Sequence, residues 1–472
     1  MVNGEPKATV IGLGRIGLPT ALWLTWQGHR VMGIDRDPSL VAAVNSGEAP
    51  FGEPGLREAL LQALGAGLLE ARTAHDERTG WASYHFICVD TGSWDGTPLD
   101  LRNLEEALAD LLPYLHGRSV VVIRSTVPPG TTEDVRLQLA ALGIDCGVAF
   151  NPEFLREGSA LHDVLFPDRM VIGADDEGTA QALSRLVAPV PAPKLFCSSR
   201  SAELVKYASN ALLALQVSFA NELARHCERV GADVYVVAQA LRLDPRIGPR
   251  AYLEPGLGFG GPCLPKDLAV LAEQGRRTGA PLALVEASLA ANRRQWAWAF
   301  EHLETELGEL EGARIAVVGL TFKAGVDDLR ASPALALAGA LHRSGAQVTA
   351  FDPWLQQPER LRPDISWAAD IYDAAAGADA LVIALPWTGL AQVDWTRLHA
   401  AMRRPLLLDC RGALRQHDLP RRGFDYVCLG LGRLGRCRDG NGQRESASDL
   451  ALRATTRPLV PLPPSECAGN GA

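Results

Sequence analysis

Residues 7–38, KATVIGLGRIGLPTALWLTWQGHRVMGIDRDP, decide the fold of the beginning of the chain. An apolar run leads into a glycine-rich turn, then a mostly apolar helical stretch, and then a second apolar run that ends at Asp35. This order predicts a strand, a helix and a second parallel strand, which form a βαβ unit. Further apolar runs at 84–90 and 119–127 each precede turn residues and a helical stretch. They extend the unit into a parallel α/β sheet.

The glycine turn has the spacing of a dinucleotide site. Gly12, Gly14 and Gly17 form GxGxxG between the strand and the helix, and Asp35 follows at the end of the next strand. The first glycine permits the tight turn, the second lets the backbone approach a pyrophosphate, and the third lets helix and strand pack. Asp35 would bind the adenosine ribose and repel a 2′-phosphate, so NAD is favoured over NADP, although Arg36 beside it is a possible phosphate ligand. A turn required only for packing is the alternative.

The rest of the chain divides into recognisable parts. From residue 201 the pattern is helical over a long span, and residues 313–353 then repeat the order of strand, turn, helix and strand, ending at Asp352. The sequence therefore predicts an α/β protein in which a central α-helical domain joins two Rossmann-like parallel-sheet domains. We expect these domains at 1–199, 200–300 and 301–440, and a flexible, Pro-, Ala- and Gly-rich tail at 441–472.

Composition excludes several classes of protein. The chain has 472 residues, 47% of them hydrophobic and 21% charged, which is typical of a globular protein. A net charge of −9 without a basic block argues against a nucleic-acid partner. Nine scattered cysteines without a CxxC pair predict free thiols in a reducing compartment and no metal site. A strand pattern close to the N-terminus and the lack of a long apolar run predict a cytoplasmic protein without a membrane segment.

One thiol stands in an unusual setting. Residues 258–268, GFGGPCLPKDL, surround Cys263 with glycines and prolines and place Lys266 and Asp267 after it. A buried structural thiol would need neither the glycines nor the charges, and a metal ligand would need partners at usable spacing. A nucleophile fits better, because glycines let a ligand approach closely and Lys266 would increase the thiolate fraction. A thiol beside a nicotinamide site favours oxidation of an aldehyde to an acid, because a thiohemiacetal can release a hydride.

Six stretches of the sequence form a distinctive set. They are VIGLGRIGLPTA (10–21), RSTVPPGTT (124–132), NPEFLREGSA (151–160), AELVKYASNALLA (202–214), GFGGPCLPKDL (258–268) and GLTFKAGVDDLRASPAL (319–335). Together they resemble the UDP-glucose/GDP-mannose dehydrogenase family and occur in the family's order, and the likeness extends to about residue 435. The resemblance implies NAD-dependent, four-electron oxidation of a nucleotide sugar at C6, from alcohol to carboxylate, with two NAD.

The resemblance also implies roles for residues near the reacting carbon. Cys263 matches the catalytic cysteine that forms the thiohemiacetal and the thioester. Lys206 matches the lysine that stabilises the oxyanion, and Asn210 one helical turn later matches its partner at the sugar. Asp267 matches an aspartate that positions water or takes protons. The remaining matches in this group are Thr126 and Glu153 in the same relay, Glu157 between cofactor and substrate, and Thr91 at the cofactor.

By the same resemblance, the second α/β domain binds the substrate's nucleoside diphosphate, and Arg330 of that domain reaches the cofactor. This placement predicts a site in the cleft between the two domains. Arg246 would contact the substrate of a neighbouring subunit, which implies a homodimer or a larger homo-oligomer. The other residues expected at the substrate are Tyr252 near the nucleotide, Gly260 in the cysteine loop, and Phe322, Lys323 and Arg411.

The sequence indicates the type of reaction more clearly than the sugar nucleotide that is oxidised. The stretch DPRIGPRAYLEPG (244–256) resembles the UDP-glucose enzymes, whereas FICVDTG (86–92) is closer to the GDP-mannose enzymes. We favour UDP-glucose and its oxidation to UDP-glucuronate, with GDP-mannose second and N-acetylated UDP-hexosamines third. Two positions depart from the family: Gly92 replaces a usual proline, and Pro262 replaces a common serine and removes one backbone N–H from the loop.

Two other hypotheses have distinct consequences. A one-step dehydrogenase of the β-hydroxyacid type would share the cofactor domain and a lysine, but it would tolerate the loss of Cys263. A catalytically silent sugar-nucleotide-binding protein would lack a catalytic group. Because Cys263, Lys206, Asn210 and Asp267 are all present, the sequence favours the enzyme.

Overall fold

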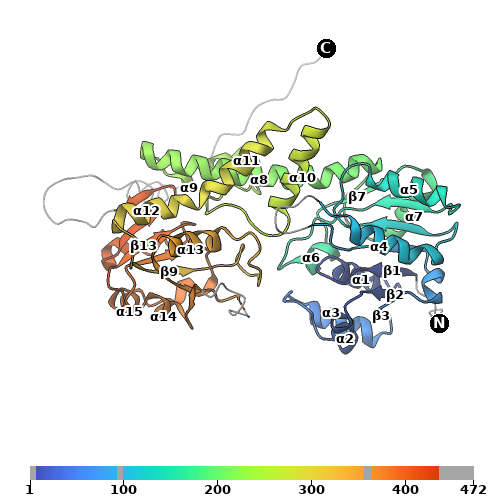
Figure 1. The fold of residues 1–472 in the computed structure, drawn as a ribbon, viewed down its shortest axis with the longest axis horizontal. Helices are drawn as coiled ribbons and strands as arrows, with labels where there is room; N and C mark the ends of the chain where they lie inside the picture. Colours follow the sequence, from blue (N-terminus) through green and yellow to red (C-terminus); the bar gives the residue numbers. More distant parts are fainter. Residues whose placement is uncertain (1–6, 93–98, 356–363, 435–472) are drawn as a thin grey trace, which may run out of the picture.

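A computed structural model describes residues 7–92, 99–355 and 364–434. Two α/β domains lie at opposite ends of the long axis, and long helices lie between them (Figure 1). The expected fold class, two Rossmann-like domains with a helical connection, is confirmed. The predicted tail at 441–472 lies outside the described residues.

The first domain contains an eight-stranded sheet in the order β3-β2-β1-β4-β5-β6-β7-β8. All neighbouring strands are parallel except β6 and β7, which are antiparallel. The apolar runs at 84–90 and 119–127 form β4 and β5, as predicted. The strand bounds are β1 Ala8–Ile11, β2 Val31–Ile34, β3 Leu69–Arg72, β4 Tyr84–Ile87, β5 Val120–Ile123, β6 Gly147–Phe150, β7 Met170–Ala174 and β8 Lys194–Cys197.

Helices cover both faces of this sheet, because its central strands are apolar on both sides. One core contains α1, α3, α6 and α7, and the opposite core contains α4 and α5. Their bounds are α1 Gly17–Trp26, α2 Pro38–Ser46, α3 Leu56–Gly65, α4 Arg102–Leu111, α5 Thr131–Ala141, α6 Ala160–Leu165 and α7 Glu177–Val187, with short 3₁₀ turns η1 Glu77–Trp81 and η2 Leu112–Tyr114.

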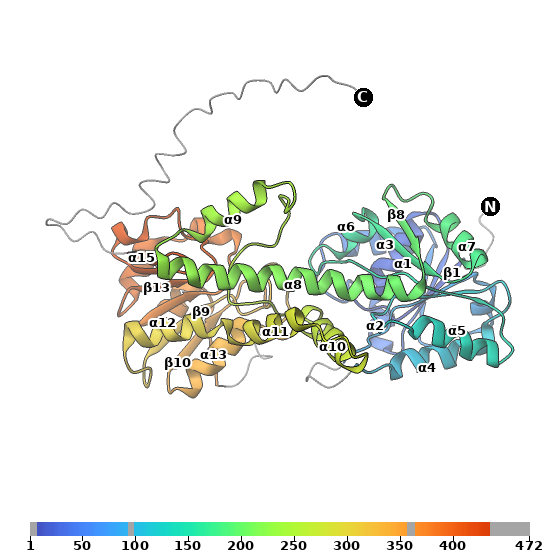
Figure 2. The ribbon, with the colours of Figure 1, turned by 90° about the horizontal axis from the view of Figure 1, so that it is seen from above.

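The central helix α8, Ser199–Val230, spans 32 residues and runs from the first domain to the second (Figure 2). Ser198 caps its start by accepting a hydrogen bond from Ser201 N, and Gly231 ends it with a φ of 72°. The predicted limit at 200 falls at the start of α8, and the limit at 300 falls inside α12. The other helices of this region are α9 Val234–Leu243, α10 Leu264–Arg277, α11 Ala283–Gln295 and α12 Ala297–Leu307.

The second α/β domain contains a seven-stranded sheet in the order β11-β10-β9-β12-β13-β14-β15, of which β15 alone runs antiparallel to its neighbour. Its bounds are β9 Arg314–Val318, β10 Gln347–Phe351, β11 Ser366–Trp367, β12 Ala380–Ile383, β13 Leu406–Asp409, β14 Asp425–Cys428, β15 Gly432–Leu434, α13 Pro333–Arg343, α14 Ile371–Ala375, α15 Trp395–Ala401, η4 Thr388–Gln392 and η5 Leu419–Arg422. None of the described helices combines the length and apolar character that crossing a bilayer requires.

The two α/β domains repeat one turn but use its acid differently. After β9, Gly319 has a φ of 88°, close to the 86° of Gly12 after β1. Asp352 accepts hydrogen bonds from Leu320 N at 2.6 Å, Thr321 N at 2.8 Å and Thr321 Oγ1 at 3.0 Å, and it is 2% exposed. Both acids accept a hydrogen bond from their own turn, but Asp352 is buried there, whereas Asp35 also lines a pocket.

Candidate functional site

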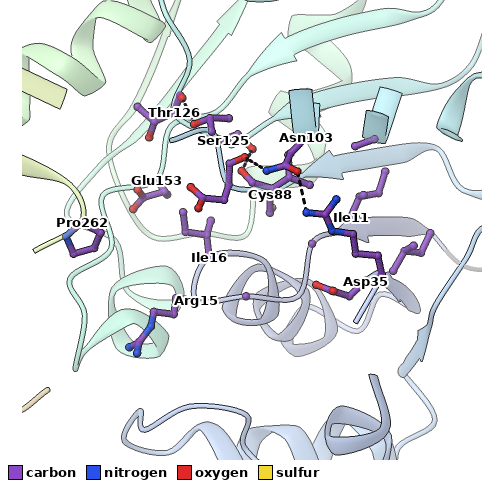
Figure 3. Close-up of a pocket in the computed structure, with 18 of the residues that line it drawn as sticks. Ile11, Arg15, Ile16, Asp35, Cys88, Asn103, Ser125, Thr126, Glu153 and Pro262 are labelled. Carbon is purple, nitrogen blue, oxygen red and sulfur yellow. Dashed lines mark hydrogen bonds between the residues drawn. The ribbon is translucent and has the colours of Figure 1, made fainter. Parts of the chain in front are cut away.

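A pocket of about 770 Å³ opens at the carboxyl ends of the first domain's strands and reaches the start of α10 and the second α/β domain. Figure 3 shows it extending from Asp35 at one end, past Thr126 and Glu153, to Pro262 at the other. It brings together ten of the predicted residues: Gly12, Gly14, Asp35, Thr91, Thr126, Glu153, Glu157, Cys263, Asp267 and Arg330.

The glycine turn fits a dinucleotide. A Cβ on Gly12 would lie 2.8 Å from Cys88 O, and a Cβ on Gly17 would lie 1.6 Å from Gly12 O, so both glycines permit close backbone packing. Gly14 has no atom within 4 Å of its Cβ position and lines the pocket, which leaves space for a pyrophosphate at the start of α1. The Asp35 carboxylate accepts hydrogen bonds from Leu13 N at 2.7 Å and Asp37 N at 3.0 Å, so it is held at the ribose end.

Cys263 immediately precedes α10, and its side chain is exposed to the pocket. Desolvation by the surrounding protein raises the pKa of its thiol to about 12, Lys206 opposes this rise, and Glu153 and Asp267 add to it. Lys266 also lowers the pKa of the thiol, in the expected direction, but it pairs with Asp267 at 2.9 Å and has less influence than Lys206. Thiolate formation therefore depends mainly on Lys206.

Lys206 and Glu153 form a buried ion pair behind the cysteine. Lys206 Nζ lies 2.7 Å from Glu153 Oε1 and donates another hydrogen bond, of 2.7 Å, to Glu153 O. Burial disfavours both charges, but their attraction outweighs it: the pKa of Glu153 is lowered and that of Lys206 is raised. The ammonium is thus held charged beside Cys263, where it can stabilise an oxyanion.

Asp267 and Asn210 form a second polar group at the same place. Asn210 Nδ2 donates to Asp267 Oδ2 at 2.6 Å, and Asp267 is only 1% exposed although it lines the pocket. Lys206 and Asn210 lie four residues apart on α8, so one helix face delivers both side chains behind the pocket wall. The arrangement places a carboxylate beside the thiol.

The glycines of the cysteine loop serve packing against the second α/β domain. A Cβ on Gly260 would lie 2.3 Å from Ala331 O, and a Cβ on Gly261 would lie 2.6 Å from Phe322 Cε2. Gly261 N also donates to Arg330 O at 2.9 Å. The structure therefore adds a reason for the glycines beyond ligand approach: they allow two segments of protein to meet.

Comparison with known proteins identifies the family. Residues 6–190, 200–294 and 316–416 match the NAD binding, central and UDP binding domains of the UDP-glucose/GDP-mannose dehydrogenase family. A UDP-glucose 6-dehydrogenase of Rhizobium meliloti is 38% identical over 434 residues, which cover 90% of this chain and 99% of the relative. The chain belongs to the UDP-glucose/GDP-mannose dehydrogenase family. It is an NAD-dependent enzyme.

Other relatives and solved structures agree with this family. UDP-glucose 6-dehydrogenase YwqF of Bacillus subtilis is 34% identical over 89% of this chain and 97% of the relative. A UDP-glucose dehydrogenase from Pyrobaculum islandicum has a TM-score of 0.81 at 38% identity, covering 87% of this chain and 96% of that one. A UDP-D-ManNAc dehydrogenase from Pyrococcus horikoshii has a TM-score of 0.80 at 30% identity, covering 90% and 99%.

Other predicted residues of this family member lie outside the pocket lining. Lys323 Nζ donates to Glu157 O at 3.0 Å, which joins the two α/β domains. The Arg411 side chain packs against Gly256, whose Cβ would lie 2.6 Å from Arg411 Nε. Arg246, with an 87% exposed side chain, pairs with its neighbour Asp244, and Tyr252 is 44% exposed.

Several residues at the site were missed from the sequence. Glu203, fully buried on α8, accepts hydrogen bonds from Gly130 N at 2.6 Å and from Thr132 N at 2.8 Å. It thereby ties the loop that carries Thr126 to the helix that carries Lys206. Its spacing of three residues from Lys206 was the available signal. Arg15, within the glycine turn, forms an ion pair with Glu157.

The departure at Gly92 has a local explanation. A Cβ there would lie 2.5 Å from Lys266 Cδ, so the aliphatic part of Lys266 occupies the space that a side chain at position 92 would need.

The two glycine positions predict opposite outcomes. Gly17→Ala places a methyl group against Gly12 O, so we expect the free energy of unfolding to fall by about 3 kcal/mol or more. Gly14→Ala meets no atom, so its stability should stay within about 1 kcal/mol of the parent while NADH binding weakens, because the methyl group enters the pyrophosphate space. Denaturant unfolding and NADH fluorescence titration measure both. Equal stability of the two variants would contradict this assignment.

Glu203→Gln should destabilise the first domain. The amide of glutamine cannot accept hydrogen bonds at both of its terminal atoms, so a buried backbone N–H loses its acceptor at a cost of about 1–3 kcal/mol. Glu133→Gln is the matched control, because Glu133 lies on the adjacent α5 and forms an exposed pair with Arg200. Its effect should stay within about 0.5 kcal/mol. A similar loss in both variants, measured by denaturant unfolding, would argue against a special role for Glu203.

Proposed function

We propose that this enzyme oxidises UDP-glucose to UDP-glucuronate through a thioester on Cys263. The single observation that carries the proposal is that one continuous pocket connects the dinucleotide end at Gly14 and Asp35 with Cys263 and Asp267. An alcohol dehydrogenase needs no thiol, whereas a thiol in this position lets an aldehyde be held covalently and oxidised again. NAD, held by Gly12, Gly14 and Asp35, would supply the hydride acceptor for both oxidations.

In the first half of the proposed reaction, the C6 alcohol loses a hydride and a proton and becomes an aldehyde. Cys263 Sγ then bonds to C6, the carbonyl π bond breaks, and the thiol proton goes to the oxygen. The charged Lys206 beside Cys263 supports this step, because it favours the thiolate and balances negative charge on the oxygen.

In the second half, the thiohemiacetal loses a second hydride and proton and becomes a thioester. A water molecule adds to C6, the C–S bond breaks, and the thiol regains a proton as the carboxylate leaves. Asp267, fixed by Asn210, is the carboxylate placed to take protons from water. Together the two halves consume one water and two hydride acceptors for each sugar nucleotide.

The choice of sugar rests on relatives and on the second α/β domain. Curated relatives at 34% and 38% identity are UDP-glucose 6-dehydrogenases, and residues 316–416 match a UDP binding domain. Arg330 of this domain lines the pocket, and Lys323 donates to the backbone of Glu157, which also lines it, so both supply positive charge for a diphosphate. The second candidate is a UDP-N-acetylhexosamine, which the likeness to the Pyrococcus horikoshii enzyme supports.

The same proposal includes a homodimer. Leu204, Leu212 and Phe219 expose 45%, 58% and 52% of their area on α8, and spacings of eight and seven residues keep them on one side of the helix. Such an apolar strip is typical of an interface. The exposed side chain of Arg246 lies outside the lining of its own pocket, which supports the expected role at a neighbouring subunit.

We also place the enzyme in the cytoplasm. Each cysteine within the described residues is a free thiol, including the exposed Cys263, which suits a reducing compartment.

The stoichiometry of NADH tests the reaction. With limiting UDP-glucose and excess NAD, we expect two NADH per sugar nucleotide by end-point absorbance, because both oxidations occur at one carbon. Cys263→Ser should lower the turnover by at least about 10³-fold, because serine is a much poorer nucleophile at neutral pH. Parallel reactions contain GDP-mannose and UDP-N-acetylmannosamine. One NADH per sugar would refute the thioester route, and turnover with UDP-N-acetylmannosamine alone would replace the proposed substrate.

The oligomeric state tests the α8 interface. Light scattering after size exclusion should give about twice the chain mass of 50.5 kDa. The double variant Leu212→Glu/Phe219→Glu should be monomeric, because it buries two carboxylates in the interface. Leu142→Glu alters an equally exposed leucine after α5, 63% exposed, and should remain dimeric. A monomeric parent protein would contradict the interface.

A further inference from the structure

Arg36 follows Asp35 at the adenosine end of the pocket, where its positive charge is compatible with the binding of NAD or of NADP. Both side chains line the pocket. An acid at the end of the second strand binds the ribose of NAD, whereas an arginine nearby accommodates the 2′-phosphate of NADP. The sequence alone therefore leaves the contribution of Arg36 open.

In the structure, α4 holds the Arg36 guanidinium. Arg36 Nη1 lies 3.2 Å from Glu106 Oε2, and Arg36 Nη2 donates to Asn103 Oδ1 at 3.0 Å. Asn103 Nδ2 in turn donates to Asp90 O at 3.0 Å, which fixes the amide with its oxygen toward the arginine (Figure 3). Two acceptors on one helix therefore take one donor from each Nη of the guanidinium and hold the group toward α4.

The charges at this end of the pocket also disfavour a phosphate. The lining there includes the carboxylates of Asp35, Glu106 and Asp110 beside the one guanidinium of Arg36. A 2′-phosphate would add further negative charge close to Asp35, and Arg36, the next residue in the chain, is a cation that could offset it. The pairing with Glu106 removes that compensation.

We propose that Glu106 and Asn103 are specificity-determining residues of the cofactor site. By holding Arg36 against α4, they withhold it from a 2′-phosphate and reinforce the preference for NAD that Asp35 establishes. The proposal concerns only the dinucleotide, so it stands whichever sugar nucleotide the enzyme oxidises.

Binary binding measurements test this proposal without any sugar nucleotide. The dissociation constants of NADH and NADPH are measured by nicotinamide fluorescence for the full-length protein at low ionic strength. The variants are Asp35→Ser, Glu106→Gln, the double variant of both, and the triple variant that adds Arg36→Ala. The Arg36–Glu106 pair is 78% and 65% exposed, so its loss should leave the fold intact, and thermal unfolding verifies this.

The expected pattern depends on Arg36. Asp35→Ser alone should shift the ratio of NADPH to NADH affinity by about tenfold, because one repulsive charge is removed. Adding Glu106→Gln should shift the ratio by about a further tenfold, because the guanidinium then loses its charged partner and the phosphate competes with a neutral amide for it. The triple variant should lose this second gain.

A matched variant separates the effect of releasing Arg36 from the effect of removing one negative charge from α4. Glu105→Gln removes the same charge from the neighbouring position of α4, where Glu105 is exposed and outside the pocket lining. In the Asp35→Ser background it should leave the ratio unchanged. An equal gain with Glu105→Gln, no gain with Glu106→Gln, or a gain that persists without Arg36 would each overturn the proposal.

Discussion

The site depends on one helix that belongs to both halves of the molecule. Ala202, near the start of α8, packs in a core of the first domain, and Ala224 and Cys227, near its end, pack in a core of the second. A helix of 32 residues is about 48 Å long and stiff, so it fixes the distance between the two sheets. Lys206 and Asn210 lie along it, and their position relative to the cofactor turn is set by the same helix.

The buried polar groups behind Cys263 are tolerated because each has a partner. Removing one member of the Lys206–Glu153 pair would leave an uncompensated charge in a protein interior, which is far more costly than an exposed pair. Desolvation raises the pKa of the Cys263 thiol, and within this network Lys206 opposes the rise more strongly than the adjacent Lys266 does. The ionisation of Cys263 therefore depends on a lysine from a distant helix as well as on its neighbour in the sequence.

Sequence reasoning succeeded where a local pattern determines the structure. Apolar runs identified β4 and β5, and the glycine spacing identified the turn at Gly12 because backbone packing there excludes any Cβ. It failed where distant segments meet. The contact of Gly260 with Ala331, the hydrogen bonds that Glu203 accepts from Gly130 N and Thr132 N, and the burial of Asp352 all depend on tertiary packing. Residue type does not reveal these contacts, and spacing gave a signal only for Glu203.

The cysteine loop packs more rigidly against the second α/β domain than against the first domain. Toward the second α/β domain the contact is backbone against backbone, with no room for a Cβ between Gly260 and Ala331 O. Toward the first domain, the long flexible stem of Lys266 lies against Gly92. In the proposed reaction, small adjustments around the cysteine loop would therefore be taken up on the cofactor side, where one dinucleotide replaces another, while Cys263 keeps its position against the second α/β domain.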